Sequence, residues 1–201
     1  MSKTEDRRAK LAGGRGRIRP MKLAHVVRRT SRFAEMLHWY QVVFGAEIAH
    51  SDGTLAFLTY DDEHHRFAIA GIPELPDQPP FAAGTDHVAF TYADLGDLLY
   101  TYARLKADGI EPYWCINHGP TTSMYYKDPD GNKVELQVDN FPTAEETNRW
   151  IRSGDFAANP IGVVFDPEDL LARYRAGESL ENLTERPPLP EGSTPFEMLR
   201  F

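Results

Sequence analysis

The chain has 201 residues, of which 41% are hydrophobic and 26% are charged, so its composition is that of a globular protein and not of a disordered one. The formal charge of -8 is unevenly placed, because residues 1–20 hold seven Lys and Arg against two acids and the rest of the chain is strongly acidic. An acidic body argues against nucleic acid as the main partner. No apolar run is long enough for a membrane span or a signal peptide, so we expect a cytoplasmic protein with no membrane partner.

After an N-terminal arm, the sequence predicts the same order of strand and helix twice. Residues 1–20 are expected to form a flexible basic arm. After it, the segments 25–48 and 87–112 share one layout, in which a His-Val pair opens a β-prone stretch and an amphipathic helical pattern follows. The two helical patterns end near Gly45 and Gly109, and glycine suits a helix C-terminus.

Three short β-prone runs follow each helical pattern, so the sequence predicts one βαβββ module at residues 21–76 and a second at 85–141. We expect an α+β fold in which the paired modules form one cupped, mostly antiparallel sheet. A proline-rich linker at 77–84 separates them, because proline continues neither a helix nor a central strand. Residues 142–201 are predicted to be a tail of helical and irregular structure. Its helices are expected near residues 144–153 and 167–176.

The stretch NHGPTTSMYYKDPDGNKVELQ at residues 117–137 raises the question of where Glu135 points. Its DPDG sequence suits a type I turn followed by a left-handed glycine, which gives a three-residue hairpin loop. In that register Tyr125 lies opposite Glu135 on the same face of the hairpin. A two-residue loop would place Met124 there instead. The sequence favours the first register, although the alternating polar pattern also fits an outer strand with a solvated Glu135.

His25 and His87 open the two repeats at equivalent positions, each in an apolar setting. A pseudo-twofold arrangement of the modules would bring them to one point. Together with Glu135 they form a candidate set of two histidines and one carboxylate, which is typical of non-haem Fe(II) oxygen chemistry. Each histidine taken alone is more often a core or surface residue, so the pattern leaves both interpretations open.

These residues resemble the vicinal oxygen chelate superfamily of glyoxalases, bleomycin-resistance proteins and dioxygenases, and within it the type I extradiol ring-cleavage dioxygenases. The resemblance covers residues 21–141. Its most specific part is the ring-cleavage signature, matched from Ile116 to Glu135. A DPDG hairpin that ends in Glu occurs throughout the superfamily, whereas the same hairpin with His118 and Tyr125 in place is far more specific.

The resemblance implies that His25, His87 and Glu135 bind Fe(II), or Mn(II) in its place, inside the cupped sheet. It implies a reaction that inserts both atoms of O2 into a catechol-type aromatic diol and cleaves the ring adjacent to the hydroxyls. Such chemistry belongs to aromatic hydrocarbon catabolism in many members of the family.

The resemblance also implies catalytic roles for three further residues. His65 falls at the family's acid/base position, His118 at its outer-shell histidine, and Tyr125 at the tyrosine that contacts the substrate oxygens. Alone, His65 would be a solvated loop residue beside His64, and Tyr125 an ordinary strand aromatic. The joint occurrence of all these residues in the right order favours the catalytic interpretation.

The chain also departs from the family pattern. Better-known members carry a second, inactive copy of the two-repeat module, whereas this chain resembles the smaller one-domain members. The segment between His65 and His87 is longer than usual, and His118 lies nearer Tyr125 than in many members. Because of the tail and the exposed sheet edges, we expect a homodimer or a higher homo-oligomer.

Two alternative functions belong to the same fold. A glyoxalase-like isomerase or lyase uses four protein ligands, but Ala68 stands where the first module would supply the fourth. A metal-free protein that sequesters a ligand needs no metal ligands, but here three ligand positions and His65 are filled. Both alternatives are therefore less favoured than the dioxygenase.

Overall fold

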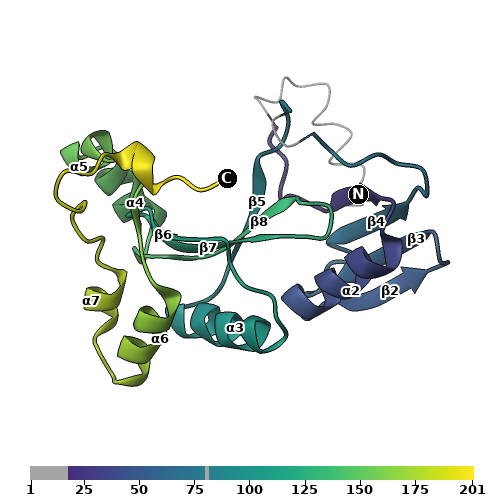
Figure 1. The fold of residues 1–201 in the computed structure, drawn as a ribbon, viewed down its shortest axis with the longest axis horizontal. Helices are drawn as coiled ribbons and strands as arrows, with labels where there is room; N and C mark the ends of the chain where they lie inside the picture. Colours follow the sequence, from purple (N-terminus) through teal and green to yellow (C-terminus); the bar gives the residue numbers. More distant parts are fainter. Residues whose placement is uncertain (1–17, 80–81) are drawn as a thin grey trace, which may run out of the picture.

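The first module forms a four-stranded sheet in the order β1-β4-β3-β2 in the computed structural model, which describes residues 18–79 and 82–201. Strands β1 and β4 are parallel, and the other neighbours are antiparallel. Figure 1 shows the single helix packed against this sheet. The expected βαβββ order is confirmed. The elements are β1 (Val26–Thr30), α2 (Phe33–Phe44), β2 (Glu47–Ser51), β3 (Leu55–Thr59) and β4 (Phe67–Gly71).

The second module repeats this arrangement, and the tail adds one strand to its sheet. The strand order is β5-β8-β7-β6-β9, with β5 parallel to β8 and the other pairs antiparallel. The second βαβββ prediction is therefore also confirmed. The elements are β5 (His87–Thr91), α3 (Leu95–Ala107), β6 (Trp114–Asn117), β7 (Thr121–Lys127), β8 (Lys133–Asp139) and, from the tail, β9 (Val163–Val164).

The α+β class with mainly antiparallel pairing is confirmed, but the two modules form two separate sheets and not one continuous sheet. Strand β1 lies at an edge of the first sheet and β5 at an edge of the second. The sheets lie side by side with α2 and α3 along the same side (Figure 1). Arg104 of α3 donates to the carbonyls of Val42 and Val43 in α2, so the modules are joined through their helices. The residue pattern of a strand predicts which of its faces is buried but not how its module docks on the other module. The sequence therefore did not predict that the modules form two sheets.

The tail packs on the second module. Its helices α6 and α7 contribute Leu170, Leu171 and Leu183 to the core that α2, α3 and both sheets share. The two expected tail helices are present, whereas the short elements between and after them were not predicted because they hold no full period of a helical or strand pattern. The tail elements are α4 (Ala144–Ile151), α5 (Gly154–Ala158), α6 (Pro167–Arg175), α7 (Leu180–Thr184) and a 3-10 turn, η1 (Pro195–Met198).

The hairpin between β7 and β8 has the predicted register. Gly131 donates to the Asp128 carbonyl at 2.8 Å, Asp128 donates to the Asn132 carbonyl at 3.0 Å, and Gly131 has a left-handed φ of 79°. Tyr125 is therefore paired with Glu135 across the strands. The three-residue loop is confirmed, and the two-residue alternative is excluded.

Some expectations concern residues that the structure does not describe. Residues 1–17 of the expected basic arm, and 80–81 of the expected linker, lie outside the described residues. Among the residues that are described, no helix is long and apolar enough to cross a membrane.

Candidate metal and substrate site

Glu135 and His87 face each other on the second sheet. The strands β5 and β8 are parallel with His87 beside Lys133 and Ala89 beside Glu135, so both side chains project from one face. The Nε2 atom of His87 lies 3.1 Å from Oε2 of Glu135, whose side chain is nearly fully buried. Glu135 is thus held inside the fold and is not the solvated residue of an outer strand.

The contact between His87 and Glu135 favours the charged form of each residue. The hydrogen bond to Glu135 raises the pKa of His87 to about 9, and Asp86 adds to this effect. Burial by itself would raise the pKa of Glu135, but hydrogen bonds with His87 and Ser123 lower it below its ordinary value. The carboxylate is therefore ionised at neutral pH, as a ligand for a cation must be.

Tyr125 lies across from Glu135 and is 3% exposed. Its ring stacks on Trp114, with the ring centroids 4.6 Å apart. Burial, followed by the neighbouring Glu135 charge, raises the pKa of the Tyr125 hydroxyl well above its ordinary value. The phenol therefore keeps its proton and acts as a hydrogen-bond donor.

His118 connects Tyr125 to the tail. Its Nε2 lies 3.0 Å from the Tyr125 hydroxyl, and its Nδ1 contacts the main-chain carbonyl of Ile161. A carbonyl only accepts, so Nδ1 carries a proton. Burial lowers the pKa of His118, which favours the neutral ring. Nε2 is then the unprotonated nitrogen and accepts the hydrogen bond that Tyr125 donates.

His25 and His65 lie together in the first module, with ring centroids 4.5 Å apart. His65 also stacks on Phe57, with centroids 4.6 Å apart. Burial, followed by the nearby His25, lowers the pKa of His65, so its ring is neutral at pH 7. A neutral imidazole can take up a proton, as the expected acid/base role requires.

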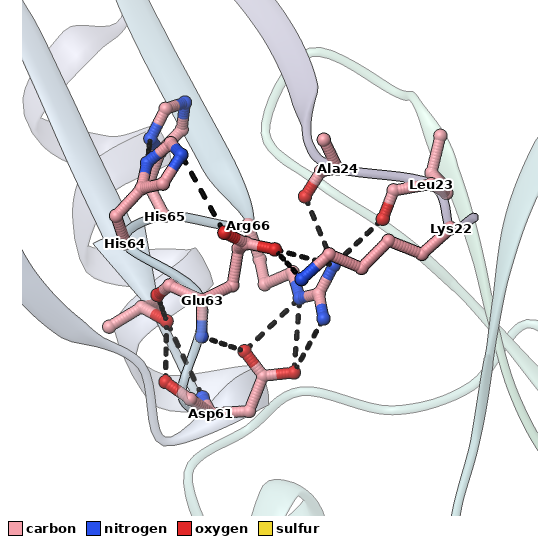
Figure 2. A network of polar contacts seen from close by, with 9 residues as sticks. Lys22, Leu23, Ala24, Asp61, Glu63, His64, His65 and Arg66 are labelled. Carbon is pink, nitrogen blue, oxygen red and sulfur yellow. Dashed lines mark hydrogen bonds and ion pairs between the residues drawn. The ribbon is translucent and has the colours of Figure 1, made fainter. Parts of the chain in front are cut away.

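A network of charged residues holds the segment that leads into β1 against the turn between β3 and β4 (Figure 2). Arg66 donates to the carbonyls of Leu23 and Ala24, at 2.7 Å and 3.1 Å, and forms an ion pair with Asp61. An ion pair between Lys22 and Glu63 adds a second link. These contacts place His25 beside the turn that carries His65.

The expected site residues therefore form two half-sites. Among the described residues, no three His, Cys, Asp or Glu side chains are close enough together to hold one metal ion. His87 and Glu135 are brought together, whereas His25 lies with His65 instead. We call the pair His25 and His65 the first half-site. The second half-site comprises His87, His118, Tyr125 and Glu135.

The donors of these half-sites fit the expected metal. Imidazole and carboxylate suit Fe(II) and Mn(II), and a set of two histidines and one carboxylate leaves positions open for further ligands. His87 and Glu135 already provide a neighbouring nitrogen and an ionised oxygen. His25 is the remaining donor of the set.

A cavity of 660 Å³ opens beside His87. This volume lies within the range of pockets that bind small molecules. Its walls include Arg28, Lys133 and the C-terminal Phe201. Sequence reasoning missed Phe201, and it also missed Trp114, although Trp114 pairs with Tyr125 across β6 and β7. Extending the hairpin register by one strand would have indicated Trp114.

Comparison with known proteins identifies the class. The family model for the Glyoxalase/Bleomycin resistance protein/Dioxygenase superfamily matches residues 22–136, more than half of the chain. The chain belongs to this superfamily, as its sequence motifs predicted.

Two similar proteins carry the name of the same enzyme activity. Biphenyl-2,3-diol 1,2-dioxygenase 2 of Rhodococcus globerulus is 47% identical over 164 residues, which cover 81% of this chain and 86% of the relative. Biphenyl-2,3-diol 1,2-dioxygenase 3 of the same organism is 44% identical over 167 residues, which cover 82% and 88%.

Solved structures are similar in fold alone. The fosfomycin resistance protein FosX of Listeria monocytogenes is 20% identical with a TM-score of 0.52, over 66% of this chain and 99% of that one. A glyoxalase-type protein of Bacillus halodurans is 18% identical with a TM-score of 0.50, over 59% and 96%.

Proposed function

We propose that the protein is an extradiol dioxygenase that uses Fe(II), or Mn(II) in its place, to insert both atoms of O2 into a catechol-type diol and to cleave the ring next to the hydroxyls. The observation that carries this proposal is the contact of the half-exposed His87 with the buried Glu135, beside Tyr125 and His118. The identity of 47% to a biphenyl-2,3-diol 1,2-dioxygenase supports it.

His25, His87 and Glu135 would hold the metal. When bound, the metal ion supplies a Lewis acid that holds the diol oxygens and a path for electrons from the diol to O2. Glu135 supplies the one negative charge among the three ligands, and its low pKa keeps that charge in place at neutral pH. Metal binding would displace the extra proton of His87, and a divalent ion with two neutral imidazoles and one carboxylate would leave the site net positive, which favours a deprotonated diol.

His65 and Tyr125 would handle the protons. Neutral His65 takes the proton of a diol hydroxyl and returns it when the ring opens. Tyr125 would keep its own proton and donate it to Nε2 of His118, 3.0 Å away. This donor can turn to a diol oxygen as negative charge develops there, because a hydroxyl rotates about its C–O bond.

Apolar rings would hold the aromatic substrate and keep water away. Trp114 lies flat against Tyr125, and Phe57 lies flat against His65. Phe201 lines the cavity beside His87. Aromatic side chains favour stacked or edge-on contacts with a substrate ring, so these three residues fit a planar diol.

A glyoxalase-like isomerase or lyase is less well supported. The strand pairing places Ala68 beside Val27, as it places Glu135 beside Ala89, so Ala68 is the counterpart of Glu135 in the first module. Alanine supplies no ligand atom. The chain thus lacks the second carboxylate that this class typically uses.

Purification without oxygen in the presence of Fe(II), followed by a panel of catechol, 3-methylcatechol and 2,3-dihydroxybiphenyl, tests the proposal. We expect oxygen uptake and a yellow ring-fission product with at least one diol. If the iron-loaded protein consumes no O2 with any of them, the dioxygenase proposal is wrong. A protein that binds the diols without turnover would instead be a ligand-sequestering member of the superfamily.

A further inference from the structure

The turn between α5 and β9 lies against the loop that carries His118. It comprises residues 159–162 and leads into β9, which pairs with the end of β6 through Asn117 and Val163. The approach is close, because a Cβ at Gly162 would lie 2.9 Å from the Cα of His118. The shape of this turn therefore determines which main-chain groups face the His118 ring.

The side chain of Asn159 holds the turn in its shape. Asn159 is 5% exposed, and its Oδ1 accepts from the amides of Ile161 and Gly162 at 3.1 Å and 2.8 Å. Its Nδ2 donates to the Gly162 carbonyl at 2.9 Å. The Ile161 carbonyl and the Gly162 amide belong to one planar trans peptide group and point in opposite directions. By holding that amide, Asn159 turns the Ile161 carbonyl away from itself and toward His118.

The main chain of Asn159 is anchored as well. Arg186 donates to the Asn159 carbonyl at 2.8 Å and to the Asp155 carbonyl at 3.0 Å. The guanidinium of Arg186 also lies over the ring of Trp150, 4.8 Å from its centroid. Asn159 is thus fixed through both its side chain and its main chain, so it can serve as a rigid support for the turn.

The Ile161 carbonyl in turn decides which nitrogen of His118 carries the proton. It accepts from Nδ1, which leaves Nε2 free to accept from the Tyr125 hydroxyl. If the carbonyl moved away, nothing would hold the proton on Nδ1, and the neutral ring could carry it on Nε2 instead. Nε2 would then be a donor toward Tyr125, and the Tyr125 hydroxyl would lose its acceptor.

We propose that Asn159 is a positioning residue for the reaction: by holding the peptide group between Ile161 and Gly162, it keeps the His118 proton on Nδ1 and so directs the Tyr125 hydroxyl as a donor. The part that concerns Tyr125 and turnover rests on the proposed function. The position of the His118 proton is a property of the protein without metal, so it can be measured separately.

Nuclear magnetic resonance of the metal-free protein tests this proton position. The chain is labelled with 15N in its histidines, and long-range 1H–15N spectra at neutral pH distinguish a protonated ring nitrogen from an unprotonated one. The signals of His118 are those that His118→Gln removes. We expect the proton on Nδ1 in the wild type and largely on Nε2 in Asn159→Ala. A wild type with the proton on Nε2, or an Asn159→Ala variant with it still on Nδ1, overturns the inference.

Glu168→Ala controls for a general loosening of the tail. Glu168 accepts from Lys106 at 2.7 Å and from Tyr102, and these contacts tie α6 to α3 without touching the turn. We expect the His118 proton to remain on Nδ1 in this variant. If it moves as it does in Asn159→Ala, the proton position depends on the tail as a whole and the specific role of Asn159 is wrong.

Asn159→Asp is the conservative variant, and it also serves if Asn159→Ala does not fold. A carboxylate can accept from both amides as the asparagine oxygen does, but it cannot donate to the Gly162 carbonyl. Because the bond to the Gly162 amide orients the Ile161 carbonyl, we expect the proton to stay mainly on Nδ1. Its transfer to Nε2 in Asn159→Asp would contradict this explanation.

Kinetics of the iron-loaded enzyme test the consequence for the reaction. We expect kcat of Asn159→Ala to fall roughly 10- to 10²-fold with KM little changed, since Asn159 acts through His118 and Tyr125 and does not touch the substrate. Asn159→Asp should recover most of the loss, and Glu168→Ala should show none. An unchanged kcat in Asn159→Ala removes Asn159 from the reaction. If the wild type itself consumes no O2, the dioxygenase proposal fails, while the spectra still decide whether Asn159 fixes the His118 proton.

Discussion

The two modules share one layout, but their strands are buried to different extents. All five residues of β2 in the first module are exposed, whereas three of the four residues of β6, its counterpart in the second, are buried. Met198 of the tail packs against Tyr125, and Trp114 donates to the Met198 carbonyl. The tail therefore covers the β6 side of the second sheet, while the β2 side of the first sheet stays exposed and the histidine-bearing strands β1 and β5 lie at the other edges.

The largest expected effect comes from removing the carboxylate that distinguishes the second module from the first. Glu135→Gln leaves the shape nearly unchanged but removes the negative charge beside His87. We expect loss of bound iron and a fall in turnover to near the uncatalysed rate, a factor of about 10⁶ or more. Iron analysis and oxygen uptake measure both. Asp139→Asn, on the exposed end of the same strand, is the control and should retain both properties.

The second largest expected effect comes from His65, the proposed acid/base of the first module. His65→Phe preserves the stacking on Phe57 but removes the base. We expect iron binding to persist while kcat falls by roughly 10²- to 10⁴-fold, which is the range for a general acid/base. The control is His64→Phe, at the exposed neighbour. Equal turnover in the two variants would remove His65 from the mechanism.

A smaller effect tests the tail's contact with the second module. A Cβ at Gly162 would meet the Asn117 carbonyl at 2.4 Å, and the residue has a φ of 122°. Gly162→Ala should therefore cost about 3 kcal/mol of unfolding free energy and displace His118, with a lower kcat. Thermal unfolding and steady-state kinetics measure these changes.

Gly177→Ala provides the matched control for this substitution. Gly177 also has a left-handed φ, of 81°, but a Cβ there would meet no atom within 4 Å. Its cost should be only the backbone strain, about 1 kcal/mol, with kcat unchanged. If both variants unfold at the same temperature, the close approach of Gly162 to Asn117 does not matter for stability.

The smallest effect concerns how the two helices begin. Asp94 caps α3 by accepting from the Asp97 amide at 2.9 Å, whereas Arg32 at the start of α2 makes no such bond to its own helix. Asp94→Ala should lower the free energy of unfolding by about 1 kcal/mol, and Asp94→Asn by only a few tenths, because asparagine is also a good cap. Chemical denaturation measures both. Equal losses would mean that the cap contributes little.

Local chemistry explains what could be predicted from the sequence. The hairpin register follows from four turn residues, Asp128 to Gly131, and that register places Tyr125 opposite Glu135. The proximity of His87 follows in turn from the βαβββ order, because β5 lies beside β8. These contacts all lie within one module, where pattern and turn type determine which residues are neighbours.

The features that could not be predicted depend on contacts between distant segments. The separation of His25 from His87 depends on how the modules dock, through bonds such as Arg32 to Asp130, which no strand pattern encodes. Strand β9 has only two residues, too few for any periodicity. The contact of Ile161 with His118 joins residues 43 positions apart through a main-chain atom.

That last contact has a consequence for how the protein can vary. The tautomer of His118 is set by the backbone oxygen of Ile161, and the Ile161 side chain serves only to pack against the apolar cluster around Tyr125. Valine, leucine or methionine at this position would present the same oxygen. Apolar substitutions of Ile161 should therefore leave the activity intact. In an alignment of related sequences position 161 would vary, and only the neighbouring Gly162, which has no room for a side chain, would mark the contact with His118.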